Sequence, residues 1–79
     1  MVYVVQGMHW NVPGVPLTLH ATKQGADKEA ASLVEIMRRE CDIETPASVS
    51  NWEDVLIDVQ DCQGAQYCDV WITEAEVRP

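Results

Sequence analysis

A single apolar stripe at helical spacing is the feature that most constrains what this chain can fold into. Apolar residues recur at the intervals i, i+3, i+4, i+7 and i+11, which predicts a helix of about four turns with one buried face. The residues of the stripe are Ala30, Leu33, Val34, Met37 and Cys41. Gly25 and Asp27 precede it, and we expect Asp27 to be the N-cap. A helix with one apolar face needs a second layer to cover that face.

A second, shorter stripe follows a connection that contains Pro46. The stripe consists of Trp52, Val55, Leu56 and Val59. Ser50 and Glu53 have the spacing of a capping box, in which the first residue caps the helix and the second reaches back. We therefore expect a helix over residues 51–61 and a left-handed exit at Gly64.

Two segments before the helices are predicted to form a β-hairpin. They are residues 2–10 and 15–22, and residues 11–14 between them have the turn sequence N-V-P-G. A register with Trp10 opposite Val15 puts the more apolar side chains on one face, which we expect to face the core. That face would carry Val2, Val4, Met8, Trp10, Val15, Leu17, Leu19 and Ala21. The outer face would carry Tyr3, Val5, His9, Thr18 and His20.

A third strand is predicted over residues 65–77, and it completes the architecture. Its β-branched and aromatic content favours a strand, and its side chains alternate between two faces. One face carries Cys68, Val70 and Ile72, and the other carries Tyr67, Asp69, Trp71 and Thr73. The expected fold is α+β, in the order β-β-α-α-β, with a three-stranded, mainly antiparallel sheet and both helices packed on one of its faces. Residues 1–79 are expected to be a single small domain, because the chain is too short for a second core. The strand order stays open.

Composition narrows the classes of function. The chain has 13 acidic and 5 basic residues and a net charge of −8, so direct binding of nucleic acid is not expected. We expect no membrane partner, because no apolar run approaches the roughly 18 residues that a span needs. The start has no basic n-region, and three cysteines do not suggest a disulfide framework, so we expect a cytoplasmic protein. Cys62 and Cys68 could approach each other across the turn at Gly64, or all three cysteines could serve as small apolar residues.

No sequence pattern indicates a reaction. The chain has no glycine-rich phosphate loop, no C-x-x-C or H-x-x-x-H spacing and no D-x-D-x-D-G run. His9 and His20 both fall on the hairpin, with no acid or nucleophile placed beside them by the sequence. We therefore expect no catalytic residues, no metal, no cofactor and no enzymatic activity.

The acidic excess lies entirely in the second half of the chain. Residues 1–39 carry four basic and three acidic residues, for a charge of +1. Residues 40–79 carry one basic and ten acidic residues, for a charge of −9. The ten are Glu40, Asp42, Glu44, Glu53, Asp54, Asp58, Asp61, Asp69, Glu74 and Glu76. We predict that these residues bind a protein partner that has a basic groove for nucleic acid.

The second helix sharpens this prediction. Asp54, Asp58 and Asp61 are spaced i, i+4, i+7 on the side opposite its apolar stripe, with no Lys or Arg in the helix to relieve them. Asp58 and Asp61 are also opposed by the helix dipole, so helix stability would not select this row. Consecutive carboxylates lie about 5–6 Å apart, a scale similar to that of phosphates along a nucleic-acid strand. The alternative is a solvated acidic face that only keeps the protein soluble.

An aromatic surface is the second candidate for binding. Five side chains are expected to gather on the outer sheet face: Tyr3, His9, His20, Tyr67 and Trp71. Aromatic side chains are favoured anchors at protein interfaces, so this face would suit a small adaptor or structural module. It would bind a protein partner or a second copy, and the sequence leaves monomer and dimer open.

The chain as a whole resembles the small acidic inhibitors that phages encode, in particular anti-CRISPR proteins. The resemblance covers size, charge, α+β layout and the absence of catalytic motifs, and it includes the acidic stretch S-N-W-E-D-V-L-I-D-V-Q-D with the flanking Glu40, Asp42 and Glu44. It implies a non-enzymatic DNA mimic that acts in the host bacterial cytoplasm. The implied target is a Cas protein or the multisubunit surveillance complex, at the site where DNA enters.

Overall fold

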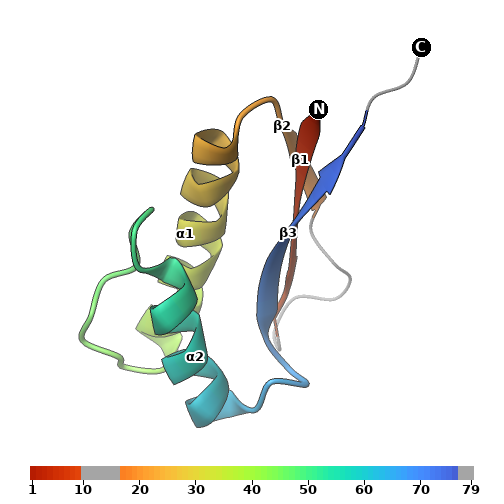
Figure 1. The fold of residues 1–79 in the computed structure, drawn as a ribbon. Helices are drawn as coiled ribbons and strands as arrows, with labels where there is room; N and C mark the ends of the chain where they lie inside the picture. The colour runs from red at the N-terminus through yellow and green to blue at the C-terminus, as the bar shows by residue number, and fades with distance from the viewer. Residues whose placement is uncertain (10–16, 77–79) are drawn as a thin grey trace.

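The computed structural model describes residues 1–9 and 17–76. Their elements follow the order β1 (Val2–Met8), β2 (Leu17–His20), α1 (Lys23–Glu40), α2 (Trp52–Gln63) and β3 (Asp69–Ala75). The predicted α+β class and the β-β-α-α-β order are therefore confirmed (Figure 1). The predicted turn at residues 11–14, with Trp10 and Val15 beside it, lies outside the described residues.

The sheet has the strand order β2-β1-β3, which the sequence left open. The central strand β1 is antiparallel to both neighbours, with Val4 opposite Leu19 on one side and Thr73 on the other. The predicted register would have paired Val4 with Ala21, so it is wrong by two residues. A shift of two leaves every side chain on the same face, because side chains alternate with a period of two.

The prediction of which face of the hairpin is buried is wrong. Val5 is 1% exposed, and the helices cover its face rather than the face of Leu17 and Leu19, which are 55% and 65% exposed. Gly7 explains why the face of Val5 is the buried one, because a Cβ at position 7 would lie only 3.1 Å from a methyl carbon of Leu33 in α1. The strand turns its glycine inward so that α1 can approach the backbone. In β3 the predicted inward face is correct: Cys68 and Val70 are buried and Ile72 is half-buried.

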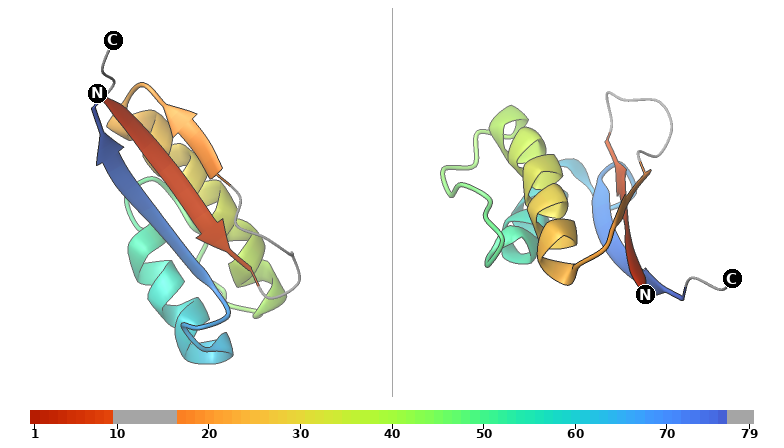
Figure 2. Two further views of the ribbon diagram at one scale, coloured as in Figure 1. Left: turned by 90° about the vertical axis from the view of Figure 1, so that its right-hand side faces the viewer. Right: turned by 90° about the horizontal axis from the view of Figure 1, so that it is seen from above.

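Both helices pack on one face of the sheet, as predicted, and its other face is uncovered by any described element (Figure 2). α1 lies behind the centre of the sheet, and α2 lies beside β3. The core between the layers joins both predicted stripes to the inner face of the sheet. Its buried members are Val5, Ala26, Ala30, Ala31, Val34, Met37, Trp52, Val55, Leu56, Val59, Cys68 and Val70.

The helix starts differ from those predicted. α1 begins after Thr22, whose hydroxyl oxygen accepts a hydrogen bond from the Gly25 amide at 3.0 Å, so Asp27 is not the N-cap. Asp27 instead accepts hydrogen bonds from the Trp52 indole at 3.2 Å and from Lys23 at 2.8 Å. This contact ties the first turn of α2 to α1.

The capping box predicted at α2 does not form. The N-cap is Asn51, and its side chain makes no bond to the helix. The side-chain oxygen Oδ1 of Asn51 instead accepts from the backbone amide of Ser48 at 2.6 Å, which closes the turn before the helix. The predicted end at Gly64 is confirmed, since its φ of 95° lies in the left-handed region that favours glycine.

Glu35 holds the long connection between the helices. Its carboxylate accepts from Arg38 at 2.7 and 2.5 Å, from Arg39 at 2.9 Å and from the backbone amide of Ala47 at 3.0 Å. Arg38 in turn donates to the carbonyl of Ile43 at 3.2 Å. The hydrogen bond from Arg38, followed by that from Ala47, lowers the pKa of Glu35 to about 2. The Glu35 carboxylate, directly and through Arg38, thereby holds both halves of the connection against α1. We call this set of hydrogen bonds the Glu35 clamp.

This clamp should make the stability of the protein depend on pH in acid. Because the pKa of Glu35 falls from 4.5 in the unfolded chain to about 2 on folding, its stabilisation is complete above pH 4.5 and is lost as the pH falls to 2. We expect Glu35→Gln to lower the free energy of unfolding at neutral pH and the difference from wild type to shrink towards pH 2. Urea unfolding followed by circular dichroism between pH 7 and pH 2 measures this.

Glu29→Gln is the matched control, because Glu29 lies on the same helix and is in no ion pair among the described residues. It should change the unfolding free energy little at any pH. A difference between Glu35→Gln and wild type that stays constant down to pH 2 would show that the clamp does not act through ionisation.

Candidate functional site

The outer side of α2 is a dense acidic surface. Glu53, Asp54, Asp58 and Asp61 are all exposed, and none is in an ion pair among residues 1–9 and 17–76. We call these four residues the α2 acidic face. The first turn of the helix holds Glu53 and Asp54, and its last turn has no basic residue. Two of the four carboxylates therefore face the unfavourable end of the helix dipole without a counter-charge.

An apolar side chain stands within this face. Ile57 is 55% exposed, and at 3.6 residues per turn it lies between Glu53 and Asp61 around the helix axis. Protein interfaces commonly combine an apolar centre with a polar rim, so Ile57 is compatible with a contact at this face.

Most described basic residues are already paired on α1. Lys23 binds Asp27, while Arg38 and Arg39 bind Glu35. Two of the three acidic groups in the first half of the chain, Asp27 and Glu35, are thus paired with cations, whereas those of α2 are left to solvent. The two helices therefore differ in charge pairing: α1 contains ion pairs, whereas α2 has exposed carboxylates without a described counter-charge.

The six other predicted acidic residues do not join the α2 acidic face in one contiguous cluster. Glu40 lies at the end of α1, with an oxygen 2.7 Å from His9 Nε2. Asp69 accepts from the Gln60 side chain at 3.3 Å and from the Val70 amide at 2.8 Å. Exposed positions in the α1–α2 connection and at the end of the sheet hold the remaining four, Asp42, Glu44, Glu74 and Glu76.

The predicted aromatic cluster does not form, because its members lie on different parts of the molecule. Tyr3 packs against the core, and it shares the inner face of the sheet with His20. His9 is held at Glu40, and its side chain is only 10% exposed. Tyr67 lies in the turn before β3 and is 53% exposed. Trp71 alone lies on the outer sheet face, where its indole donates to Gln6 at 3.1 Å.

The outer sheet face is nevertheless apolar, through residues assigned to the core by the sequence. Leu17 and Leu19 are its most exposed members, and Trp71 lies across β1 from Leu17. Val2, Val4 and Met8 are half-buried on the same face. No described helix covers these side chains, so they form a second surface available to a partner.

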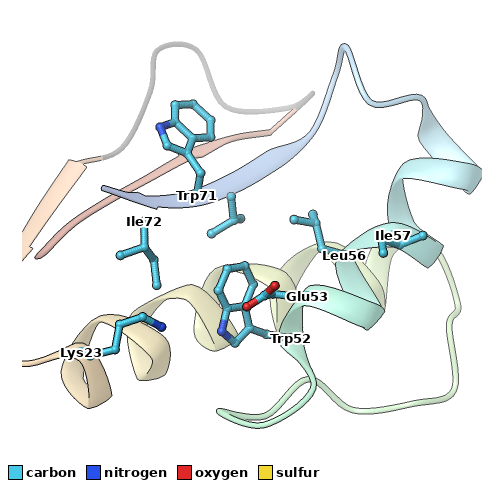
Figure 3. A pocket seen from close by; sticks show the side chains of 8 residues that line it. Lys23, Trp52, Glu53, Leu56, Ile57, Trp71 and Ile72 are labelled. Atoms are coloured by element: carbon cyan, nitrogen blue, oxygen red, sulfur yellow. The ribbon is translucent and has the colours of Figure 1, made fainter. Parts of the chain in front are cut away.

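A groove of about 440 Å³ runs between α2 and β3 (Figure 3). Its apolar floor and walls come from Trp52, Leu56, Ile57, Val70 and Ile72, and Trp71 borders it. Ile72 points towards the helices, whereas the ring of Trp71 points away from them. Lys23 and Glu53 also line it, and further along α2 Gln60 donates to the carbonyl of Cys68 at 3.1 Å. This groove was not predicted from the sequence, because it depends on which strand lies beside α2.

The cysteines are free thiols in different environments. Cys62 is exposed, and Cys68 is fully buried with its thiol donating to the Gly64 carbonyl at 3.6 Å. Burial raises the pKa of the Cys41 thiol. Burial likewise raises the pKa of Cys68. Cys68 is thus a small apolar core residue, as one of the two alternatives had it, but Cys62 is not.

The described residues contain no group of three or more His, Cys, Asp or Glu side chains that could hold a metal ion. Among the described helices, none is long and apolar enough to cross a membrane. The described residues form a small α+β protein with an acidic helix, an uncovered sheet face and a groove between α2 and β3. Comparison with protein-family models, with curated proteins and with solved structures finds no match to this chain.

Proposed function

We propose that this protein is a non-enzymatic inhibitor that presents the α2 acidic face to a basic, nucleic-acid-binding groove of another protein. The observation that supports it is the set of four exposed carboxylates that no described cation pairs, on one helix packed rigidly against the core. Lys and Arg side chains that normally hold phosphates would pair with Glu53, Asp54, Asp58 and Asp61. Ile57 would supply an apolar contact within the same interface.

The form of the target follows from the resemblance to anti-CRISPR proteins. On that basis the partner is a Cas protein or surveillance complex in a bacterial cytoplasm, and the inhibitor occupies the site where target DNA enters. The dispersed acidic residues would extend the negative field and speed the encounter with a basic partner. They are Glu40, Asp42, Glu44, Asp69, Glu74 and Glu76.

The salt dependence of binding tests the proposal. The tagged protein is used to capture partners from a nuclease-treated bacterial lysate at about 50 mM salt, and the wash is repeated at about 500 mM, where screening shortens to a few ångströms. We expect a nucleic-acid-handling protein to be captured at low salt, released at high salt and displaced by added double-stranded DNA. A partner that DNA does not displace would contradict mimicry.

A second candidate function is supported by the uncovered sheet face. Leu17 and Leu19 expose more than half of their surface there, which suits an adaptor that binds a protein through apolar contacts. This candidate predicts a partner that stays bound at about 500 mM salt and is lost on Leu19→Lys. Tyr3→Ala would not test this face, because Tyr3 packs against the core.

A further inference from the structure

The groove between α2 and β3 is open along the free edge of a strand. β3 pairs with β1 on one side only, and no described strand pairs with its other side. In an antiparallel sheet, every second residue of an edge strand points its N–H and C=O groups away from its partner. The groove therefore combines unpaired backbone groups with an apolar lining.

We propose that this groove binds an extended, basic peptide segment of a protein partner, which adds as a fourth strand to the free edge of β3. A strand added there would lie about 4.8 Å from β3, on the side where α2 lies. Its backbone would bond to β3, and alternate side chains would enter the groove towards Leu56, Ile57 and Ile72. This proposal goes beyond the inhibitor function, because it concerns a different binding mode.

Charge favours a basic segment as the occupant. Lys23, the one cation among the described residues that line the groove, is already bound to Asp27 at 2.8 Å, and the hydrogen bond with Asp27 raises its pKa. Glu53, which also lines the groove, has no ion pair among the described residues, and β3 itself carries Asp69 and Glu74. The surroundings of the groove are thus net negative. A second copy of this chain, with its own charge of −8 and the same acidic strand, would be repelled where a Lys- or Arg-bearing strand would be attracted.

The probe is a phage-displayed library of random peptides of about ten residues, long enough to form one strand. We expect selection on the full chain to enrich peptides in which apolar residues alternate with Lys or Arg. A synthetic copy of an enriched peptide should shift amide resonances of β3 and α2, and methylating its alternate backbone nitrogens should abolish binding. Enrichment of acidic peptides, resonance shifts confined to the outer sheet face, or no enrichment at all would overturn the proposal.

Two isoleucines with nearly equal exposure supply the matched variants. Ile57 lines the groove and is 55% exposed, while Ile36 lies on α1 away from it and is 56% exposed. We expect Ile57→Lys to weaken binding of the enriched peptide at least about tenfold and Ile36→Lys to leave it unchanged. Circular dichroism verifies that both variants fold. Equal effects of the two variants, or protection of β3 amides through concentration-dependent dimerisation of the free protein, would contradict a peptide partner.

Discussion

Changing Asp54, Asp58 and Asp61 together to lysine should weaken binding to the basic partner at least about a hundredfold. The three side chains are exposed and unpaired among the described residues, so the change alters the net charge from −8 to −2 without removing a described intramolecular ion pair. Each lysine would face a Lys or Arg of the partner, and losing about 1.4 kcal/mol of binding free energy costs a factor of ten. Titration of the captured partner at several salt concentrations measures the loss.

A second triple variant separates the acidic helix from bulk charge. Glu29→Lys, Glu44→Lys and Glu74→Lys give the same net charge of −2 from three other parts of the chain. Because long-range attraction mainly sets the association rate, this variant should lose much less affinity than the α2 variant. The free energy of unfolding of both variants should lie within about 0.5 kcal/mol of that of wild type, because five of the six positions are exposed and surface substitutions usually change it by no more than this. Equal losses of affinity in the two would show that α2 holds no specific contact.

Replacing Trp52 with alanine should remove a large part of the free energy that stabilises the folded protein. Trp52 is 6% exposed in the core, and its indole N–H donates to Asp27. Truncating a buried tryptophan costs about 3–5 kcal/mol, whereas a domain of 79 residues is stabilised by only about 4–12 kcal/mol. Urea unfolding followed by circular dichroism should show a midpoint at a much lower urea concentration than that of wild type.

Two further substitutions separate the contribution of the indole hydrogen bond from that of apolar burial. Trp52→Phe keeps most of the apolar surface and loses the indole hydrogen bond, so it should cost about 1 kcal/mol beyond the change in packing. Trp71→Ala removes a tryptophan that is half-buried on the outer sheet face, and it should cost much less than Trp52→Ala. If Trp71→Ala proved the more damaging change, the outer face would be part of the stabilising core.

The helices and the fold class could be predicted because their patterns are local. Each helix has one apolar stripe at a period of 3.6 residues, and the buried residues Val34, Met37, Val55 and Val59 all come from those stripes. The helix starts were harder to predict. Thr22 and Asn51 compete as caps with Asp27 and Ser50, and tertiary contacts decide, since Asp27 is held by the Trp52 indole.

Hydrophobicity alone predicts the wrong buried face of the hairpin. Leu17 and Leu19 are more apolar than Thr18 and His20, yet they lie outside. The signal that favoured the observed face is Gly7, since a glycine within a strand often marks the close approach of another element. The error propagated to the aromatic candidates, of which only Trp71 lies on the outer face.

The candidate sites also differ in how far they could be predicted from the sequence. The acidic row on α2 follows from helical spacing alone, so its exposure could be predicted, although its role as a binding site stays a prediction. The groove required the strand order β2-β1-β3, which places β3 at an edge beside α2. Sequence spacing contains no information on that order, because the pairing of β1 with β3 joins residues far apart in the chain.

The strand order also dictates when the sheet can form. β1 lies at the centre, but one of its two partners is built from residues 65 positions later, as the contact between Gln6 and Trp71 shows. Contacts of such separation form slowly, because the loop that joins them must first close. During synthesis, β1 and β2 can pair early, while one edge of β1 waits for β3. A nascent chain that has emerged only as far as α2 therefore exposes a strand edge that can pair with other chains.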